Sequence, residues 1–316
     1  MRVVFIGASG FGLRAAEVLA GLPDCQLVGV LTAPRQFSIS YRPTGVTNVL
    51  HVDMSEFAAA HAIPCQFLGK GMNDPELFSA VCDWRPDCFI VVGWYHMVPA
   101  AWRKVAPAYG LHASLLPDYS GGAPLVWAMI NGERRTGITF FQFADGVDNG
   151  PVVGSLPTDI SPDDTIATLY ARIEDLGLQL LHDYVPLLAR GTARFMQQDE
   201  SKRRLCPQRS PEDGCIDWNQ GADRIHDFIR AQTRPYPGAF AMLRESKVSI
   251  WRSALRPGEA PQLQPGELVL MGGRLWVGCG QQTVLEIVEV GEHGSDGIAA
   301  DWAQGKAIRA GEAFDV

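Results

Sequence analysis

The residues of this chain that could carry out chemistry lie in one stretch, which begins at His112 and ends at Asp148. His112 opens the segment His-Ala-Ser-Leu-Leu-Pro, and Asp148 stands in a Gly-Val-Asp-Asn-Gly turn. Between them, the pattern predicts a helix over residues 123–130 and a strand over residues 137–143. A strand-helix-strand unit can bring its two ends side by side at a sheet edge. An imidazole and a carboxylate in one pocket can move a proton during acyl transfer.

Four ordered features of this stretch resemble the folate-dependent formyltransferases. They are the His-x-Ser-Leu-Leu-Pro block, Trp-Ala-x-x-x-Gly-Glu over residues 127–133, Thr-Gly-Ile-Thr over residues 136–139, and the spacing to Asp148. Segments near residues 216–218, 225–231 and 235–240 resemble the second domain of the tRNA and sugar formyltransferases. The resemblance implies transfer of a formyl group from 10-formyltetrahydrofolate to an amine. A hydrolytic branch of the family passes the formyl group to water instead.

The hydrophobic pattern predicts an α/β fold with a doubly wound, mostly parallel sheet, because strand-like and helix-like segments alternate from residue 2 to residue 92. Loops 93–99, 112–122 and 144–151 each follow a predicted strand, so we expect all three at the ligand edge of the sheet. Short strand-like runs after residue 238 predict a small β domain, and the resemblance implies an OB-like barrel preceded by a helix. We expect a catalytic domain over residues 1–190, a linker over 191–209 and the small domain over 210–316.

The resemblance assigns roles to particular residues. It implies that His112 acts on the oxyanion and the proton, and that Asp148 orients His112 and helps to deprotonate the amine. The residues expected to hold the pterin are Gly93, Trp94, Tyr95, His96, Met97, Val98, Phe143 and Asp145. Those expected near the acceptor are Ser114, Tyr119, Gly121 and Gly122.

One position departs from the family pattern. The transferases carry an asparagine two residues before the histidine, which donates to the formyl oxygen, whereas this chain has Gly110. Losing one oxyanion donor costs about a hundredfold to a thousandfold in rate. Either another donor replaces the asparagine, such as water, His96 or a backbone amide, or the chemistry changes. Since the hydrolytic branch also lacks this asparagine, hydrolysis stays open, as does a folate-binding relative without turnover.

Composition limits the partners. The net charge of −8 argues against nucleic acid as the main partner. No apolar run reaches the ~20 residues that a membrane helix needs, and the N-terminus has the pattern of a first strand and not of a signal peptide. The seven cysteines show no CxxC spacing, so we expect reduced thiols, a cytoplasmic protein and no metal site. A homodimer stays open.

Residues 7–12 follow the pattern GxxGxG, unlike the dinucleotide-binding pattern GxGxxG, and favour a packing turn.

The acceptor is predicted from charge and resemblance. Many relatives carry an arginine before the first glycine of the pair, where this chain has Ser120. Loop 33–49 is a candidate for acceptor specificity, yet it carries only Arg35 and Arg42 as basic residues, too few for the basic loop of a tRNA enzyme. We therefore expect a nucleotide-linked amino sugar as acceptor, with initiator methionyl-tRNA as the alternative.

Overall fold

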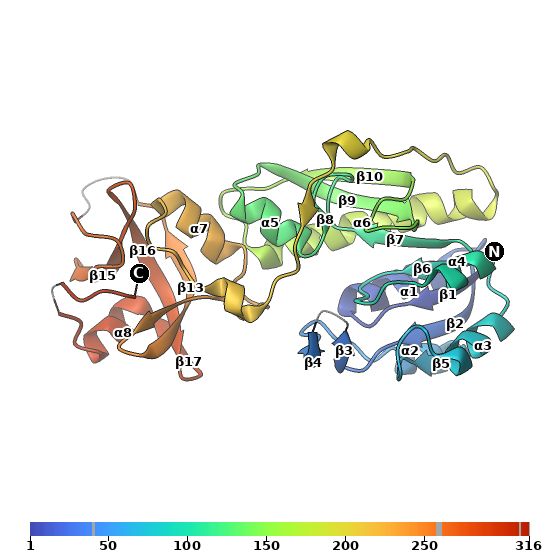
Figure 1. Cartoon of the computed structure of the whole chain (residues 1–316), viewed down its shortest axis with the longest axis horizontal. Helices are drawn as coiled ribbons and strands as arrows, with labels where there is room; N and C mark the ends of the chain where they lie inside the picture. Colours follow the sequence, from blue (N-terminus) through green and yellow to red (C-terminus); the bar gives the residue numbers. More distant parts are fainter. Residues whose placement is uncertain (40–41, 257–260, 310, 316) are drawn as a thin grey trace. The chain divides into compact units, whose positions relative to one another are not determined.

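The computed structural model of the chain describes residues 1–39, 42–256, 261–309 and 311–315 (Figure 1). It separates into two compact units. The first comprises residues 1–121, 136–158 and 171–205, and the second comprises residues 122–135, 159–170 and 206–316. Each unit is described by itself below.

The first unit is built on a seven-stranded sheet with the strand order β10-β9-β7-β6-β1-β2-β5. Strands β1, β2, β5, β6 and β7 pair in parallel, and β9 pairs with β7 in the antiparallel direction. The sheet is therefore mostly parallel, as predicted. Its strands are β1 (Arg2–Ile6), β2 (Gln26–Thr32), β5 (Cys65–Phe67), β6 (Cys88–Val91), β7 (Ala108–His112), β9 (Arg135–Gln142) and β10 (Val152–Asp159).

The central strands are continuous apolar runs because helices cover both faces of a parallel sheet. All four residues of β6 are buried, as are four of the five residues of β1. The Ser9 hydroxyl caps the first helix by accepting from the Gly12 N–H at 3.1 Å. The helices are α1 (Gly10–Gly21), α2 (Ser55–Ala60), α3 (Pro75–Asp83), α4 (Ala100–Val105), α6 (Ile166–Ala189) and the short η1 (Glu200–Lys202).

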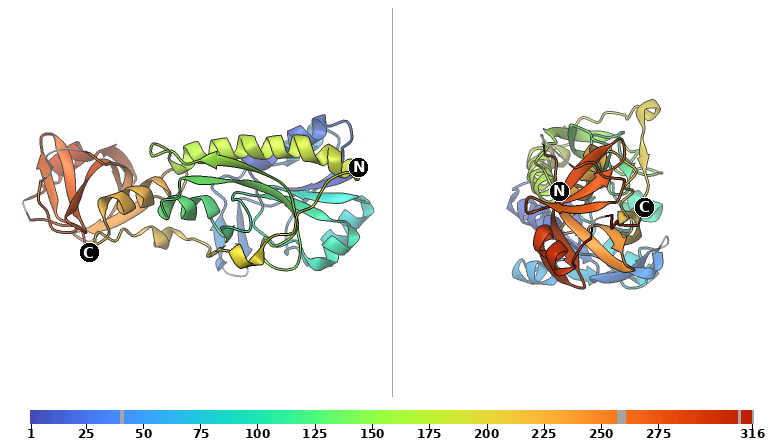
Figure 2. Two further views of the ribbon diagram at one scale, coloured as in Figure 1. Left: turned by 90° about the horizontal axis from the view of Figure 1, so that it is seen from above. Right: turned by 90° about the vertical axis from the view of Figure 1, so that its left-hand side faces the viewer.

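Glycine allows α6, a single long helix in Figure 2, to pack closely against the sheet of the first unit. A Cβ on Gly177 would lie 2.6 Å from Phe11 and 2.8 Å from Ile138. Ile138 belongs to β9, the strand that pairs with β7. The helix thus supports the strand that ends at His112.

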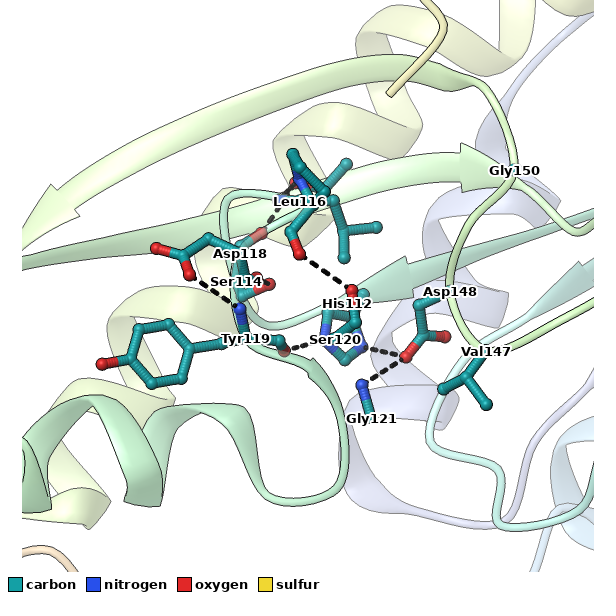
Figure 3. A network of polar contacts seen from close by, with 12 residues as sticks. His112, Ser114, Leu116, Asp118, Tyr119, Ser120, Gly121, Val147, Asp148 and Gly150 are labelled. Carbon is teal, nitrogen blue, oxygen red and sulfur yellow. Dashed lines mark hydrogen bonds and ion pairs between the residues drawn. The ribbon is translucent and has the colours of Figure 1, made fainter. Parts of the chain in front are cut away.

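The direction of β9 corrects one expectation. Its end, Gln142, pairs with Tyr109, and Thr139 pairs with His112. The loop after β9 therefore starts at the opposite end of β7 from His112, and not at the shared carboxyl edge expected of a parallel strand. The loop after β9 nevertheless brings Asp148 to His112 (Figure 3).

Loop 33–49 contains a hairpin that the sequence pattern did not predict. Strands β3 (Gln36–Ile39) and β4 (Arg42–Thr47) pair in the antiparallel direction. Tyr41, part of the proposed specificity loop, lies outside the described residues. Two short strands, β8 (Ser120–Gly121) and β11 (Leu205–Cys206), form a separate pair.

The second unit contains an antiparallel sheet with the order β12-β13-β16-β15-β14, and β17 pairs with β16. Its buried core includes Trp218, which stacks on Phe314 at 5.3 Å between ring centroids. The strands bend around this core (Figure 2). The elements are α5 (Pro124–Ile130), η2 (Pro211–Gly214), α7 (Ala222–Arg230), β12 (Ala239–Leu243), β13 (Ser246–Ala254), β14 (Leu268–Met271), β15 (Arg274–Cys279), β16 (Thr283–Glu292), β17 (Ser295–Ile298) and α8 (Ala299–Gly305). The C-terminal part of the chain thus combines helices with an antiparallel sheet, in agreement with the predicted fold class.

Among the helices that the structure describes, none combines the length and the apolar character needed to cross a lipid bilayer.

Candidate active site

His112 and Asp148 face each other in the first unit (Figure 3). The imidazole Nδ1 lies 3.4 Å from Asp148 Oδ2, and the two side chains are 11% and 24% exposed. The same carboxylate oxygen accepts a hydrogen bond of 2.8 Å from the Gly121 N–H. The structure thus brings together the histidine and the aspartate that the sequence singles out.

The second ring nitrogen fixes the imidazole. His112 Nε2 lies 2.8 Å from the carbonyl oxygen of Tyr119. A carbonyl can only accept, so Nε2 carries a proton. In the neutral ring, Nδ1 is then the basic nitrogen, and it faces Asp148. A proton arriving on Nδ1 turns this contact into an ion pair.

The loop after His112 is held by its own polar groups. Ser114 is buried, and its hydroxyl donates to the Asp118 carbonyl at 2.6 Å. The hydroxyl of buried Thr139, on β9, donates to the Ser114 carbonyl at 2.7 Å. Tyr119 has a left-handed backbone, with φ of 52°, and its side chain is buried. These contacts aim the Tyr119 carbonyl at His112.

Three residues from the expected linker also touch this site, and the sequence reasoning missed them. The Gln198 amide donates to the carbonyls of Asp148 and Gly150, at 2.8 and 2.7 Å. Arg203 donates to Ser120 Oγ at 2.7 Å. Arg204 pairs with the Asp118 carboxylate, and its guanidinium lies 4.2 Å from the centre of the Tyr119 ring. The consecutive arginines were the available signal, but a polar segment between two domains is typical of a solvated connection.

The space beside Gly110 is filled. A Cβ on this residue would lie 2.5 Å from Phe143 Cε1 and 3.1 Å from the Val91 carbonyl oxygen. Gly110 pairs with Val91 across strands β7 and β6. The Phe143 ring therefore occupies the place in which the side chain of the family asparagine would start.

Most of the expected pterin loop lies against an aromatic cluster. His96 packs against Phe37 and Trp94, with ring centroids 5.0 and 5.5 Å apart, and Tyr95 lies 5.3 Å from Phe37. Within the described part of the chain, the buried atoms His96 Nε2 and Trp94 Nε1 have no hydrogen-bond partner. Burial lowers the pKa of His96. Gly93 has φ of 64°, and a side chain there would overlap the Ser9 hydroxyl.

The remaining predicted residues differ in their surroundings. Met97 is 66% exposed, and Val98 is buried. Asp145 is exposed and pairs with Arg103 at 2.6 Å, which lowers the pKa of its carboxyl group. Gly122 belongs to the second unit, where its N–H donates to the Cys206 carbonyl.

The glycine turn of residues 7–12 packs closely against neighbouring backbone. A Cβ on Gly7 would lie 2.5 Å from the Val92 carbonyl oxygen. Elsewhere, the described residues contain no group of three or more His, Cys, Asp or Glu side chains that could hold a metal ion.

Solved structures with this fold include three kinds of protein. The chain aligns with an N-formyltransferase from Helicobacter canadensis, in complex with folinic acid and dTDP-3-aminofucose, at 15% identity and a TM-score of 0.65, over 90% of this chain and 98% of that one. HypX from Aquifex aeolicus, in complex with tetrahydrofolic acid, matches at 16% identity and a TM-score of 0.62, over 96% of this chain and 47% of that one. Methionyl-tRNA formyltransferase from Clostridium thermocellum matches at 17% identity and a TM-score of 0.54, over 82% and 95%. The chain thus spans about half the length of HypX.

Family models cover both parts of the chain. The model described as formyl transferase matches residues 2–185, and the model described as formyl transferase, C-terminal domain, matches residues 209–307. The first match alone spans more than half of the sequence and includes both His112 and Asp148. The chain belongs to the formyltransferase family.

Proposed function

We propose that this chain transfers a formyl group from 10-formyltetrahydrofolate to the amine of a small acceptor, a nucleotide-linked amino sugar. The observation that carries the proposal is the His112–Asp148 pair, held at 3.4 Å in the domain that the family model matches. An imidazole with one nitrogen fixed by a carbonyl and the other beside a carboxylate is oriented for proton transfer.

In the proposed reaction, the acceptor amine attacks the formyl carbon. The new carbon–nitrogen bond turns the formyl oxygen into an oxyanion. The carbonyl then re-forms as the bond from the carbon to N10 of the folate breaks, and in total one proton passes from the amine to N10. Asp148 Oδ2 is held by Gly121, while Oδ1 accepts no hydrogen bond from the described residues and is available to accept the amine proton. Passage of that proton from Asp148 to His112 Nδ1 leaves the imidazole positively charged beside the oxyanion, and the imidazole then gives the proton to N10.

The residues of loop 93–98 fit a heteroaromatic ring with several donors and acceptors. His96 Nε2 and Trp94 Nε1 are buried without partners among the described residues, and Tyr95 is 40% exposed. Buried polar atoms without partners cost stability unless a ligand satisfies them. This cost supports the assignment of the pterin to this loop, with Phe143 on its other side.

The choice of acceptor rests on charge and on the family. The net charge of −8 disfavours a polyanionic tRNA. The Helicobacter canadensis relative was solved with dTDP-3-aminofucose. An amino sugar on a nucleotide supplies an amine on a small carrier, and we take it as the acceptor class.

A specific observation favours hydrolysis as the second candidate. Gly110 provides no side-chain donor, and the apolar Phe143 ring fills the adjacent space. The hydrolytic branch of the family also lacks this asparagine, so the gap is compatible with water as the acceptor. Water in place of the amine would then release formate.

The test is the conversion of 10-formyltetrahydrofolate to tetrahydrofolate, followed by absorbance with and without amines. The panel contains dTDP-3-aminofucose and initiator methionyl-tRNA, and released formate is measured in parallel. We expect turnover that requires the amino sugar and falls about a hundredfold or more in Asp148→Asn. Turnover without an amine, with matching formate, would replace the transferase with a hydrolase.

Asp183→Asn is the matched control. Asp183 also lies beside a histidine, His182, at 3.1 Å, but this pair is exposed on α6. The Asp183→Asn variant should keep full turnover. An equal loss in both variants would mean that the effect of Asp148→Asn comes from removing a charge and not from the site. Full activity in Asp148→Asn would refute the assigned role.

A further inference from the structure

Arg203 joins the two loops that carry the His112 partners. Its Nη1 donates to Ser120 Oγ at 2.7 Å and to the Val147 carbonyl at 3.0 Å. Ser120 directly follows Tyr119, whose carbonyl holds His112, and Val147 directly precedes Asp148. Arg203 Nη1 therefore contacts the residue after Tyr119 and the residue before Asp148. Tyr119 and Asp148 are the two residues that contact the His112 ring nitrogens.

The remaining N–H groups of the guanidinium are also hydrogen-bonded. Nε and Nη2 donate to the two Glu200 carboxylate oxygens at 2.6 and 2.7 Å, and Nη2 also lies 3.4 Å from Gln198 Oε1. The side chain is only 12% exposed. A planar arginine guanidinium with all its N–H groups hydrogen-bonded fixes the geometry of its partners more tightly than the flexible ammonium group of a lysine does.

Gln198 and Arg204 complete this arrangement. The Gln198 amide bridges the carbonyls of Asp148 and Gly150. The Arg204 carbonyl accepts from the Ser120 N–H at 2.9 Å. Asp148 has a left-handed backbone, with φ of 49°. A non-glycine residue keeps this conformation only where its surroundings enforce it.

We propose that Arg203 is a positioning residue, which fixes the His112 tautomer and the approach of Asp148 by tying the 114–121 loop to the 143–150 loop. This inference rests on the proposed function for its effect on rate. Its effect on the imidazole is independent of that function, because the tautomer is a property of the protein without ligands. Removing Arg203 breaks one of the links between the two loops, which weakens the hold of the Tyr119 carbonyl on Nε2.

The experiment compares wild type with Arg203→Met and Arg203→Lys in two measurements. Steady-state kinetics separate kcat from KM for 10-formyltetrahydrofolate. Nuclear magnetic resonance of the full chain labelled with ¹⁵N-histidine reads the protonation of each ring nitrogen of His112, which is assigned from His112→Gln. Lys202→Met is the control, because Lys202 is adjacent, 75% exposed, and pairs with Asp199 alone among the described residues.

In Arg203→Met we expect kcat to fall about tenfold to a hundredfold with KM little changed, as for other residues that orient a catalytic group. The His112 spectrum should change from protonated Nε2 to a mixture of tautomers. Arg203→Lys keeps the charge but cannot reach all the partners of Arg203. Its kcat and its His112 spectrum should therefore lie between those of wild type and Arg203→Met. Lys202→Met should match wild type in both measurements.

An unchanged His112 spectrum in Arg203→Met overturns the proposal, and so does a loss confined to KM. If the wild type shows no turnover, the proposed function fails, while the spectrum alone still decides the role of Arg203. If Arg203→Met does not fold, Gln198→Leu tests the same arrangement from the Asp148 side, with the same spectral change expected and an unchanged spectrum again contrary to it.

Discussion

The contact between Gly110 and Phe143 leads to a quantitative prediction about stability. A Cβ on Gly110 would lie 2.5 and 2.6 Å from two atoms of the Phe143 ring. Carbon atoms in contact prefer about 3.5–4.0 Å, so the overlap in Gly110→Ala is about 1 Å. Overpacking of this kind costs about 1–3 kcal/mol. Phe143→Ala removes a half-buried ring and should cost less than the ~3–5 kcal/mol of a fully buried one.

The double variant should cost less than the sum of the two single variants. Without the ring, the nearest atom to the methyl group introduced by Gly110→Ala is the Val91 carbonyl oxygen, at 3.1 Å. The φ of Gly110 lies outside the left-handed region, so alanine also gains about 0.4–1 kcal/mol by restricting the unfolded chain. We expect a favourable coupling energy of about 1–3 kcal/mol between the two substitutions.

Urea unfolding followed by far-ultraviolet circular dichroism measures the four free energies of this cycle. Gly21→Ala is the control, because no atom lies within 4 Å of its new Cβ, and it should shift stability by less than about 1 kcal/mol. Additive costs in the cycle would refute the idea that the ring excludes a side chain at position 110. Gly110→Asn combined with Phe143→Ala should restore an oxyanion donor and raise formyl transfer relative to Phe143→Ala alone, by at most about a thousandfold.

Two further predictions concern loop 93–98. Gly93→Ala should destabilise the chain by at least about 1–2 kcal/mol, because its backbone is left-handed and the new methyl group overlaps the Ser9 hydroxyl; a urea midpoint equal to that of wild type would contradict this. Burial lowers the pKa of His96 in the folded state below the ordinary value of 6.5, so the unfolded state binds more protons as the pH falls through 6.5, and stability should decline below that pH. The pKa of His226 shifts in the same direction, so wild type must be compared with His96→Gln. The urea midpoint of wild type minus that of His96→Gln should be smaller at pH 5.5 than at pH 7.5.

Local patterns were sufficient to predict the elements that frame the site. Apolar strands alternate with helices between residues 2 and 92, as predicted, and the helix at Pro124–Ile130 lies within the predicted range 123–130. Both patterns are encoded by neighbouring residues, and a proline suits the first turn of a helix. The proximity of His112 and Asp148 followed from the resemblance, whereas the expected route through a strand ending beside His112 was wrong.

Features that depend on distant partners could not be read in this way. The antiparallel direction of β9, the β3–β4 hairpin and strand β10 are set by pairing between strands and not by local pattern. The role of Gln198 and Arg203 was hidden because their partners lie about 50 or more residues earlier in the chain. The contact of the Phe143 ring with Gly110 could likewise not be predicted from the sequence, because the absence of a side chain at Gly110 does not indicate which residue fills the space.

The contacts of Gln198, Arg203 and Arg204 determine where an excisable fragment of the chain could end. A fragment cut at residue 190, the end of the predicted catalytic domain, would keep His112 and Asp148 but would lose all three of these side chains, which tie their loops together from outside. A fragment that ends after Leu205, the last residue of the first unit, would retain them. A boundary drawn from the sheet alone would therefore omit three side chains that contact the loops of His112 and Asp148.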